Sequence, residues 1–184
     1  MNFNKHLNLK DRHALFGAST YSWVNYDDQK LIETVNNQMA VQRGTRLHAL
    51  AAELIDLGQK LPKTHNTLNM YVNDSIRHHM VPEQKLYYSD NFFGTADAIQ
   101  FKNNLLRIFD YKSGRIPAKM TQLKIYAALF CLEYKVKPGT IDFELRIYQS
   151  DEVFVENPTA EDILPIMDKI VHFDKLINKL KKGD

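Results

Sequence analysis

Asp97, Asp110 and Lys112 are the residues of this 184-residue chain whose types and spacing could do chemistry. Carboxylate oxygens are the ligands that hard cations such as Mg²⁺ and Mn²⁺ prefer. The amine of Lys112, two residues beyond Asp110, lies on the same face of a strand. Two carboxylates that face each other across strands destabilise a sheet, and a bound cation is the simplest compensation. The pattern therefore predicts a divalent-metal site with an amine beside it.

A β-hairpin must position these three residues, and its register follows from its turn. The strand-like runs 95–101 and 105–112 flank Asn103-Asn104, and Asn tolerates the positive φ that a two-residue turn of the primed type requires. This turn pairs Lys102 with Leu105, Phe101 with Leu106, Ile99 with Ile108 and Asp97 with Asp110. A slip of one residue would break the last pairing, so the alternative is a surface hairpin whose charges are solvated separately.

The composition is that of an ordinary globular chain, with 44% hydrophobic and 25% charged residues and a formal net charge of +2. The length suits one domain over residues 1–184, with residues 1–14 polar and flexible. A mildly positive charge restricts nucleic-acid contact to a local patch. The single cysteine, Cys131, excludes an internal disulfide and a four-cysteine zinc or iron–sulfur site. Without a membrane-length apolar run or a signal-peptide core, the chain is expected to be cytoplasmic.

Helices and further strands are predicted around the hairpin. Helical patterns cover 27–57, with a break near 43–45, and 67–79, and a strand over 80–89 leads into the hairpin. After the hairpin, a helix is expected from Pro117 to about Lys135, then strands over 140–149 and 152–155, and a final helix over 159–180. This order predicts an α/β fold, a small mixed β-sheet flanked by α-helices on both faces.

Several other residues have two interpretations each. His48 lies in an apolar helical stripe, where a histidine is either a satisfied core residue or a ligand. Glu83 is either another acidic group near the site or, as we favour, an edge charge of its strand. Gln122 and Tyr126 are neighbours on one helix face, so they either support the helix structurally or lie near the site. A local basic rim is expected from Arg115, Lys119 and Lys124.

Taken in order, these pieces resemble the RecB-type branch of the PD-(D/E)xK nuclease superfamily. The matching segments are Gly44-Thr45-Arg46-Leu47-His48, Gly94-Thr95-Ala96-Asp97, Asp110-Tyr111-Lys112-Ser113-Gly114 and Gln122-Leu123-Lys124-Ile125-Tyr126-Ala127. The N-terminal Ser19…Trp23 is similar to the opening segment of phage-encoded members. The resemblance spans roughly residues 13–150.

The resemblance implies a restriction-endonuclease-like core and metal-dependent hydrolysis of DNA phosphodiester bonds, by an exonuclease of recombination, repair or end processing, possibly phage-encoded. It implies that Asp97, Asp110 and Lys112 are catalytic. The ligands of one or two Mg²⁺ or Mn²⁺ ions would be His48, Asp97, Asp110 and the Tyr111 carbonyl, without an iron–sulfur cluster. The residues that contact DNA or support the site would be Gln122, Tyr126, Arg115, Lys119 and Lys124.

Two other functions fit the same residues. One is an endonuclease of restriction or defence type, and the other is a catalytically silent DNA-binding protein with the nuclease fold. The partners expected are DNA, a recombination or single-strand-annealing protein and further copies of the chain, but no membrane. A phage-encoded protein would act in the cytoplasm of its host.

Overall fold

The computed structural model describes residues 5, 7 and 13–183. The chain divides into two units, Met1–Gln42 and Arg43–Asp184, and each is described by itself. The predicted flexibility of residues 1–14 concerns mostly residues outside the described part. None of the helices within residues 13–183 combines the length and the hydropathy that a membrane span requires.

The first unit contains a short 3-10 helix, η2 (Ala18–Asn25), and the first half of helix α1 (Asp28–Asp56). The indole N–H of Trp23 donates to the Gly17 carbonyl at 3.0 Å, and its ring meets Phe16 edge-on. No residue of η2 is buried and Trp23 is 37% exposed. Within this unit the Phe16 ring also meets Tyr26 edge-on, so the aromatic side chains of the segment pack on one another.

Helix α1 is continuous through residues 43–45, so the predicted break is wrong. A glycine inside a helix costs about 1 kcal/mol relative to alanine, which is why Gly44 suggested a break. The missing side chain of Gly44 instead leaves room for Ser113, because a Cβ at position 44 would lie 3.0 Å from the Ser113 hydroxyl oxygen. The helix ends at Asp56, close to the predicted end at residue 57, and Gly58 just beyond it has a left-handed φ of 64°, which favours glycine.

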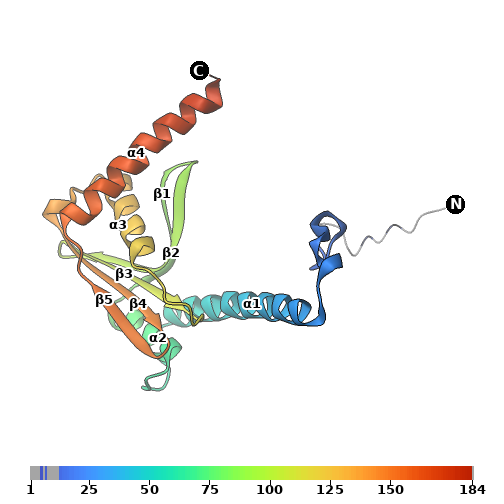
Figure 1. Ribbon diagram of the computed structural model, residues 1–184. Coiled ribbons are helices and arrows are strands. Elements are labelled where there is room, and N and C mark those ends of the chain that lie inside the picture. The colour runs from blue at the N-terminus through green and yellow to red at the C-terminus, as the bar shows by residue number, and fades with distance from the viewer. Residues whose placement is uncertain (1–4, 6, 8–12, 184) are drawn as a thin grey trace. The chain divides into compact units, whose positions relative to one another are not determined.

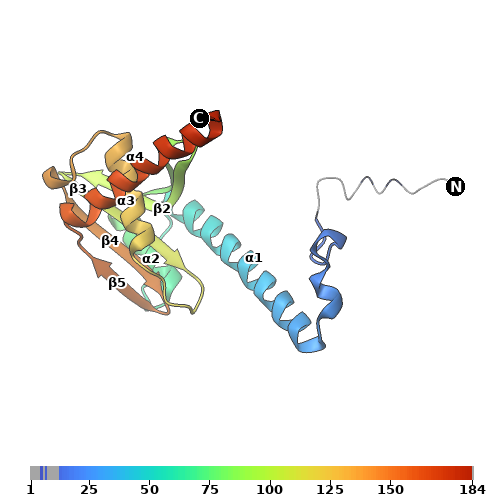
Figure 2. The same cartoon turned by 45° about the horizontal axis from the view of Figure 1, so that its top comes forward.

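The second unit is built on a mixed sheet of five strands in the order β1-β2-β3-β4-β5. Their bounds are β1 Val81–Ser89, β2 Phe92–Lys102, β3 Leu105–Lys112, β4 Asp142–Gln149 and β5 Glu152–Glu156. Only β3 and β4 run parallel, and helix α3 (Thr121–Glu133) makes the crossover that this pair requires. Helices α3 and α4 (Ala160–Lys182) cover one face of the sheet and α2 (Thr67–Arg77) the other (Figures 1 and 2). The predicted α/β fold with a mixed sheet between helices is confirmed.

The β2–β3 hairpin has the predicted turn and register. Asn103 and Asn104 have φ values of 53° and 58°, as a primed turn demands. The predicted pairs from Lys102–Leu105 to Ile99–Ile108 are all present, and the ladder ends at Ala98–Phe109. It therefore stops one pair before Asp97 and Asp110, so the two strands diverge where the carboxylates lie.

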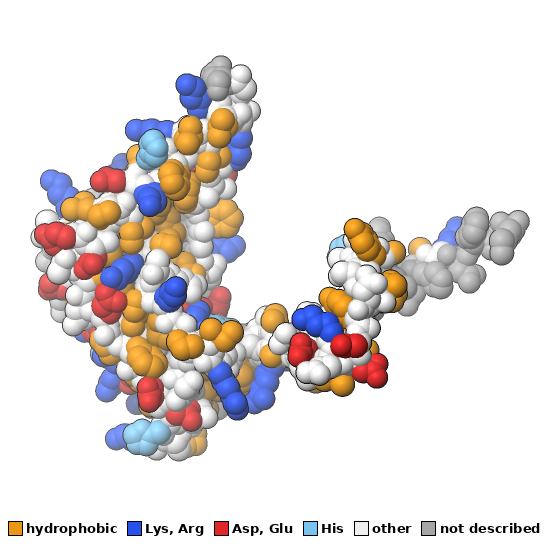
Figure 3. Space-filling view, viewed as in Figure 1, with side chains coloured by type: hydrophobic (Ala, Val, Ile, Leu, Met, Phe, Trp, Pro, Cys, Tyr) orange, Lys and Arg blue, Asp and Glu red, His pale blue; other side chains and the backbone are white. Residues whose placement is uncertain are grey.

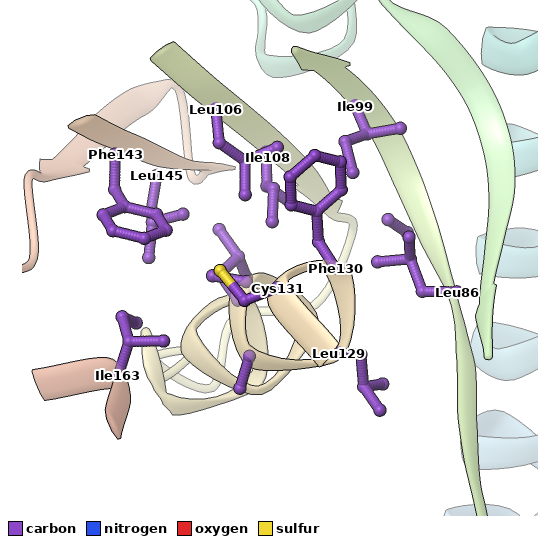
Figure 4. Close-up of a cluster of buried hydrophobic side chains, with 14 of the residues drawn as sticks. Leu86, Ile99, Leu106, Ile108, Leu129, Phe130, Cys131, Phe143, Leu145 and Ile163 are labelled. Atoms are coloured by element: carbon purple, nitrogen blue, oxygen red, sulfur yellow. The ribbon is translucent and has the colours of Figure 1, made fainter. Parts of the chain in front are cut away.

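Apolar side chains form a separate layer on each face of the sheet. Figure 4 shows the layer beneath α3, in which strand residues Leu106, Ile108, Phe143 and Leu145 point toward Phe130 and Cys131 of α3 and Ile163 of α4. On the other face, Tyr71 and Val72 of α2 pack in one cluster with Phe109, Tyr111 and Tyr148. Because both faces are covered, β3 and β4 are fixed on either side, and the residues at their ends are held in place.

Helix α3 begins at Thr121, so the predicted start at Pro117 is wrong. The residues before it form a loop that Gln149, 5% exposed, holds in an open conformation. The Gln149 amide donates to the carbonyls of Gly114 and Ile116 at 2.6 and 2.7 Å and accepts the Ala118 N–H at 3.0 Å. These backbone groups are satisfied by one side chain and need no helical partner.

Candidate metal centre

His48, Glu83 and Asp97 converge from α1, β1 and β2. Each offers a ligand atom, and these atoms all lie within 4.8 Å of one another, which makes this the group in the described residues that could hold a metal ion. His48 Nδ1 is 3.3 Å from Asp97 Oδ2. The structure thus places the His48 imidazole against a carboxylate at the candidate site, while its role as a metal ligand stays a prediction.

Glu83 lies on an edge strand, as the favoured interpretation requires, but its carboxylate also belongs to the cluster with His48 and Asp97, as the other interpretation proposed. In a regular hairpin continued from the Ser89–Phe92 pair, Glu83 would lie opposite Ala98. A bulge next to Ser89 shifts the register by one residue, and Glu83 then comes opposite Asp97. Its φ of 49° is left-handed, a conformation that costs a residue with a side chain about 1–3 kcal/mol. The signal available in the sequence was a third acidic residue on the strand next to Asp97.

The Asp97 side chain binds the backbone of β3 where the β2–β3 ladder ends. Its Oδ2 accepts the Tyr111 backbone N–H at 2.9 Å, so a side chain replaces the main-chain partner of that amide. The Tyr111 ring meets the His48 imidazole edge-on at 5.2 Å between centroids. Tyr111 therefore lies at the site and helps to orient His48, while its carbonyl as a ligand stays a prediction.

Asp110 is an almost completely buried carboxylate, 1% exposed. Its Oδ1 accepts a hydrogen bond from Lys112 Nζ at 2.9 Å, but its Oδ2 is buried and has no hydrogen-bond partner among the described residues. Burial, and then the charge of Asp97, raise the pKa of Asp110 to about 6, although Lys112 opposes this. A buried acceptor without a donor costs about 1–3 kcal/mol, and a cation beside Oδ2 would remove that cost.

The same concentration of negative charge acts on His48 and Glu83. The hydrogen bond to Asp97 raises the pKa of His48, although burial of the ring opposes the shift. Desolvation, followed by the charge of Asp97, raises the pKa of Glu83. Burial is the first cause of the shifts of Asp110 and Glu83, and the charge of Asp97 adds to both. A bound divalent cation would favour the ionised carboxylates and the neutral imidazole, and so would act against all three shifts.

Lys112, Gln122 and Tyr126 form a chain of hydrogen bonds beside Asp110. Lys112 Nζ donates to Gln122 Oε1 at 3.1 Å, and Gln122 Nε2 donates to the Tyr126 hydroxyl at 3.1 Å. The helix-face pair predicted from the sequence thus lies at the site. Its first contact is with the lysine, which is held between Asp110 and Gln122.

The predicted basic rim is only partly at the site. A cavity of about 470 Å³ beside Lys112 is lined by Arg115 as well, and Lys119 is exposed on the same loop. Lys124 instead points toward β5 and α4, where its amine lies 2.6 Å from Glu156 and 3.5 Å from Asp162. Arg43, which the sequence interpretation left out, is close enough for its charge to lower the pKa of Tyr111, against the larger raising effect of burial.

No protein-family model matches the chain, and a search of curated proteins found no match either. The resemblance to RecB-type nucleases therefore stays a prediction, and it depends on the residues of this chain alone.

Proposed function

We propose that the chain is a divalent-metal-dependent nuclease that hydrolyses DNA phosphodiester bonds, acting in the cytoplasm as an exonuclease of recombination, repair or end processing. One observation carries the proposal. The ligand atoms of His48, Glu83 and Asp97 lie within 4.8 Å of one another, and beside them Asp110 keeps a buried oxygen that has no donor in the described part of the chain. Such a set of groups suits a cation better than it suits a metal-free carboxylate cluster.

The donor set indicates which ions fit. Carboxylate oxygens from Glu83, Asp97 and Asp110 suit Mg²⁺ and Mn²⁺, and the imidazole nitrogen of His48 favours Mn²⁺. His48 must be neutral to bind a metal, so a proton and the metal compete for the imidazole. When bound, such an ion would lower the pKa of a coordinated water and stabilise charge on the phosphoryl oxygens.

Lys112 is the residue that would act on the reacting groups. An ammonium has three N–H donors, and the hydrogen bonds to Asp110 and Gln122 use two of them. The third donor can orient the attacking water or neutralise the charge that develops on the phosphate. Because two bonds hold the amine, this donor has a fixed direction, which is what electrostatic stabilisation of a transition state requires.

Contacts to DNA are expected to be local and independent of sequence. Lys and Arg side chains are interspersed with Asp and Glu on the face of the second unit that Figure 3 shows, in agreement with a net charge of only +2. Arg115 and Lys119, on the loop after β3, and Arg43, on α1, are the candidates for phosphate contacts. Contacts of this kind position a nucleic acid but do not select its sequence.

The test is incubation with end-labelled linear and closed circular DNA, in Mg²⁺, Mn²⁺ or EDTA. We expect metal-dependent loss of linear DNA, no opening of circles, and no cleavage by Lys112→Ala with its fold largely preserved. Lys175→Ala, which changes an exposed lysine on α4, is the matched control and should keep full activity. Opening of circles would identify an endonuclease. No cleavage with either metal would overturn the proposal in favour of a silent DNA-binding protein.

A further inference from the structure

We infer that Gly94 is a positioning residue for the Lys112 amine and that it acts through Tyr126 and Gln122. The inference rests on the proposed function, since it names a residue without a side chain as a determinant of that site. Gly94 lies on β2, three residues before Asp97, and Tyr126 lies on α3. Gly94 itself makes no hydrogen bond to the lysine, so its effect has to pass through packing.

The first step is a close contact between Gly94 and the Tyr126 ring. A Cβ added to Gly94 would lie 2.8 Å from Tyr126 Cε1, far inside the normal separation of about 3.5–4.0 Å between carbon atoms. The φ of Gly94 is not in the left-handed region, so the backbone does not require glycine here. Glycine is present for space, because the aromatic ring occupies the place of its side chain.

The second step is that the ring, and not the strand, must move if a side chain is added. Gly94 pairs with Leu86 in the β1–β2 ladder, and Leu86 is completely buried beneath α3. The residues before and after Gly94 pair with β1 as well, Phe93 with Tyr87 and Thr95 with Lys85, so this ladder holds the strand along its length. The Tyr126 ring is only half-buried and can turn toward solvent, taking its hydroxyl with it.

The third step leads from the hydroxyl to the amine. The Tyr126 hydroxyl accepts the Gln122 Nε2 hydrogen bond at 3.1 Å, and the other end of the same amide, Oε1, accepts the Lys112 hydrogen bond at 3.1 Å. The Tyr126 contact thus fixes the rotation of the Gln122 amide and keeps its oxygen toward Lys112. If the hydroxyl is lost, the amide can rotate and the amine keeps only its bond to Asp110.

The experiment is Gly94→Ala, with Gly139→Ala as the matched control. A Cβ at Gly139 meets only the Ala160 Cβ, at 4.0 Å, and Gly139 precedes β4 at the end of the sheet away from Lys112. We expect Gly94→Ala to lower kcat about 100-fold, the loss that a misplacement of about 1 Å can cause. KM should change little, because the phosphate-binding residues are untouched. Gly139→Ala should retain the kcat of the wild type.

A double-mutant cycle with Tyr126→Ala tests the route. If Gly94 acts through the ring, Gly94→Ala should have no further effect on kcat once the ring is absent. Additive effects of the two substitutions would overturn the inference. If Gly94→Ala does not fold, Tyr126→Phe replaces it, because it removes the hydroxyl and keeps the ring, and an unchanged kcat in that variant would also overturn the inference.

Crystal structures of the wild type and Gly94→Ala separate this inference from the proposed function. We expect a turned Tyr126 ring and a broken Gln122–Lys112 hydrogen bond in the variant, whether or not the protein cleaves DNA. If the wild type is inactive but the variant shows these structural changes, the proposed nuclease activity is overturned and the positioning role of Gly94 stands. An active wild type whose Gly94→Ala variant retains the Gln122–Lys112 bond and full kcat would overturn the positioning role alone.

Discussion

Asp110→Asn should stabilise the metal-free protein at alkaline pH, although it removes a residue of the candidate site. The folded protein raises the pKa of this carboxyl from 3.8 to about 6. A difference of about two pH units corresponds to about 3 kcal/mol, at about 1.4 kcal/mol for each unit. That value already contains the favourable bond to Lys112. For a chain of this length, about 3 kcal/mol corresponds to about 6–12 °C in melting temperature.

The sign of the pH dependence follows from the direction of the shift. Between the unfolded pKa near 4 and the folded pKa of about 6, the folded state binds the proton and the unfolded state does not. The stability of the wild type therefore falls as pH rises through this window and carries the full penalty above it. The asparagine side chain of the variant has no charge to bury, so the advantage of the variant should be large at pH 8 and small at pH 4.

The assay is thermal melting in EDTA at pH 4 and pH 8. Asp142→Asn is the control, because Asp142 is exposed at the start of β4. This substitution should change the free energy of unfolding by less than about 0.5 kcal/mol. Adding Mn²⁺ at about 100 times its Kd should stabilise the wild type by about 2.7 kcal/mol and the variant much less. A variant that melts below the wild type at pH 8 in EDTA would refute the argument, as would an advantage that is equal at both pH values.

Glu83→Gln should weaken Mn²⁺ binding by about 10-fold or more, measured by calorimetry, because it removes one charged ligand from the cluster with His48 and Asp97; unchanged affinity would exclude Glu83 from the coordination sphere. Gln149→Ala should destabilise the protein by about 1–3 kcal/mol, because it leaves buried backbone groups of the loop after β3 without partners. Limited proteolysis should then cut that loop faster than in the wild type, and an unchanged cleavage rate would show that the loop does not depend on Gln149.

The hairpin and most of the candidate site could be predicted because they depend on local signals. Asn103-Asn104 set the turn, and alternation along β3 then placed Ile108, Asp110 and Lys112 on one face. The spacing of Gln122 and Tyr126 similarly placed both on one turn of a helix. Each of these inferences uses residues that are close in sequence, where the geometry of one strand or one helix is sufficient.

The incorrect predictions share a different origin, which is contact between distant segments. Gly44 was expected to break α1, but the helix continues through it, and the missing side chain leaves room for the Ser113 hydroxyl. Pro117 was expected to begin α3, but Gln149, on a strand that follows α3, holds that segment as a loop. Local propensity is weak, about 1 kcal/mol at Gly44, and a few tertiary contacts override it.

The sequence by itself determined the types of the chemical groups, the order of the elements and the pairing of β2 with β3. Only the tertiary structure decided which groups meet. It brought His48 to Asp97, left one oxygen of Asp110 buried without a partner in the described residues, and turned Lys124 away toward Glu156. It also added Glu83, because a single bulge in β1 changes which residue faces Asp97. The physical reason is that side chains alternate along a strand, so a register shift of one residue decides whether a carboxylate joins the site.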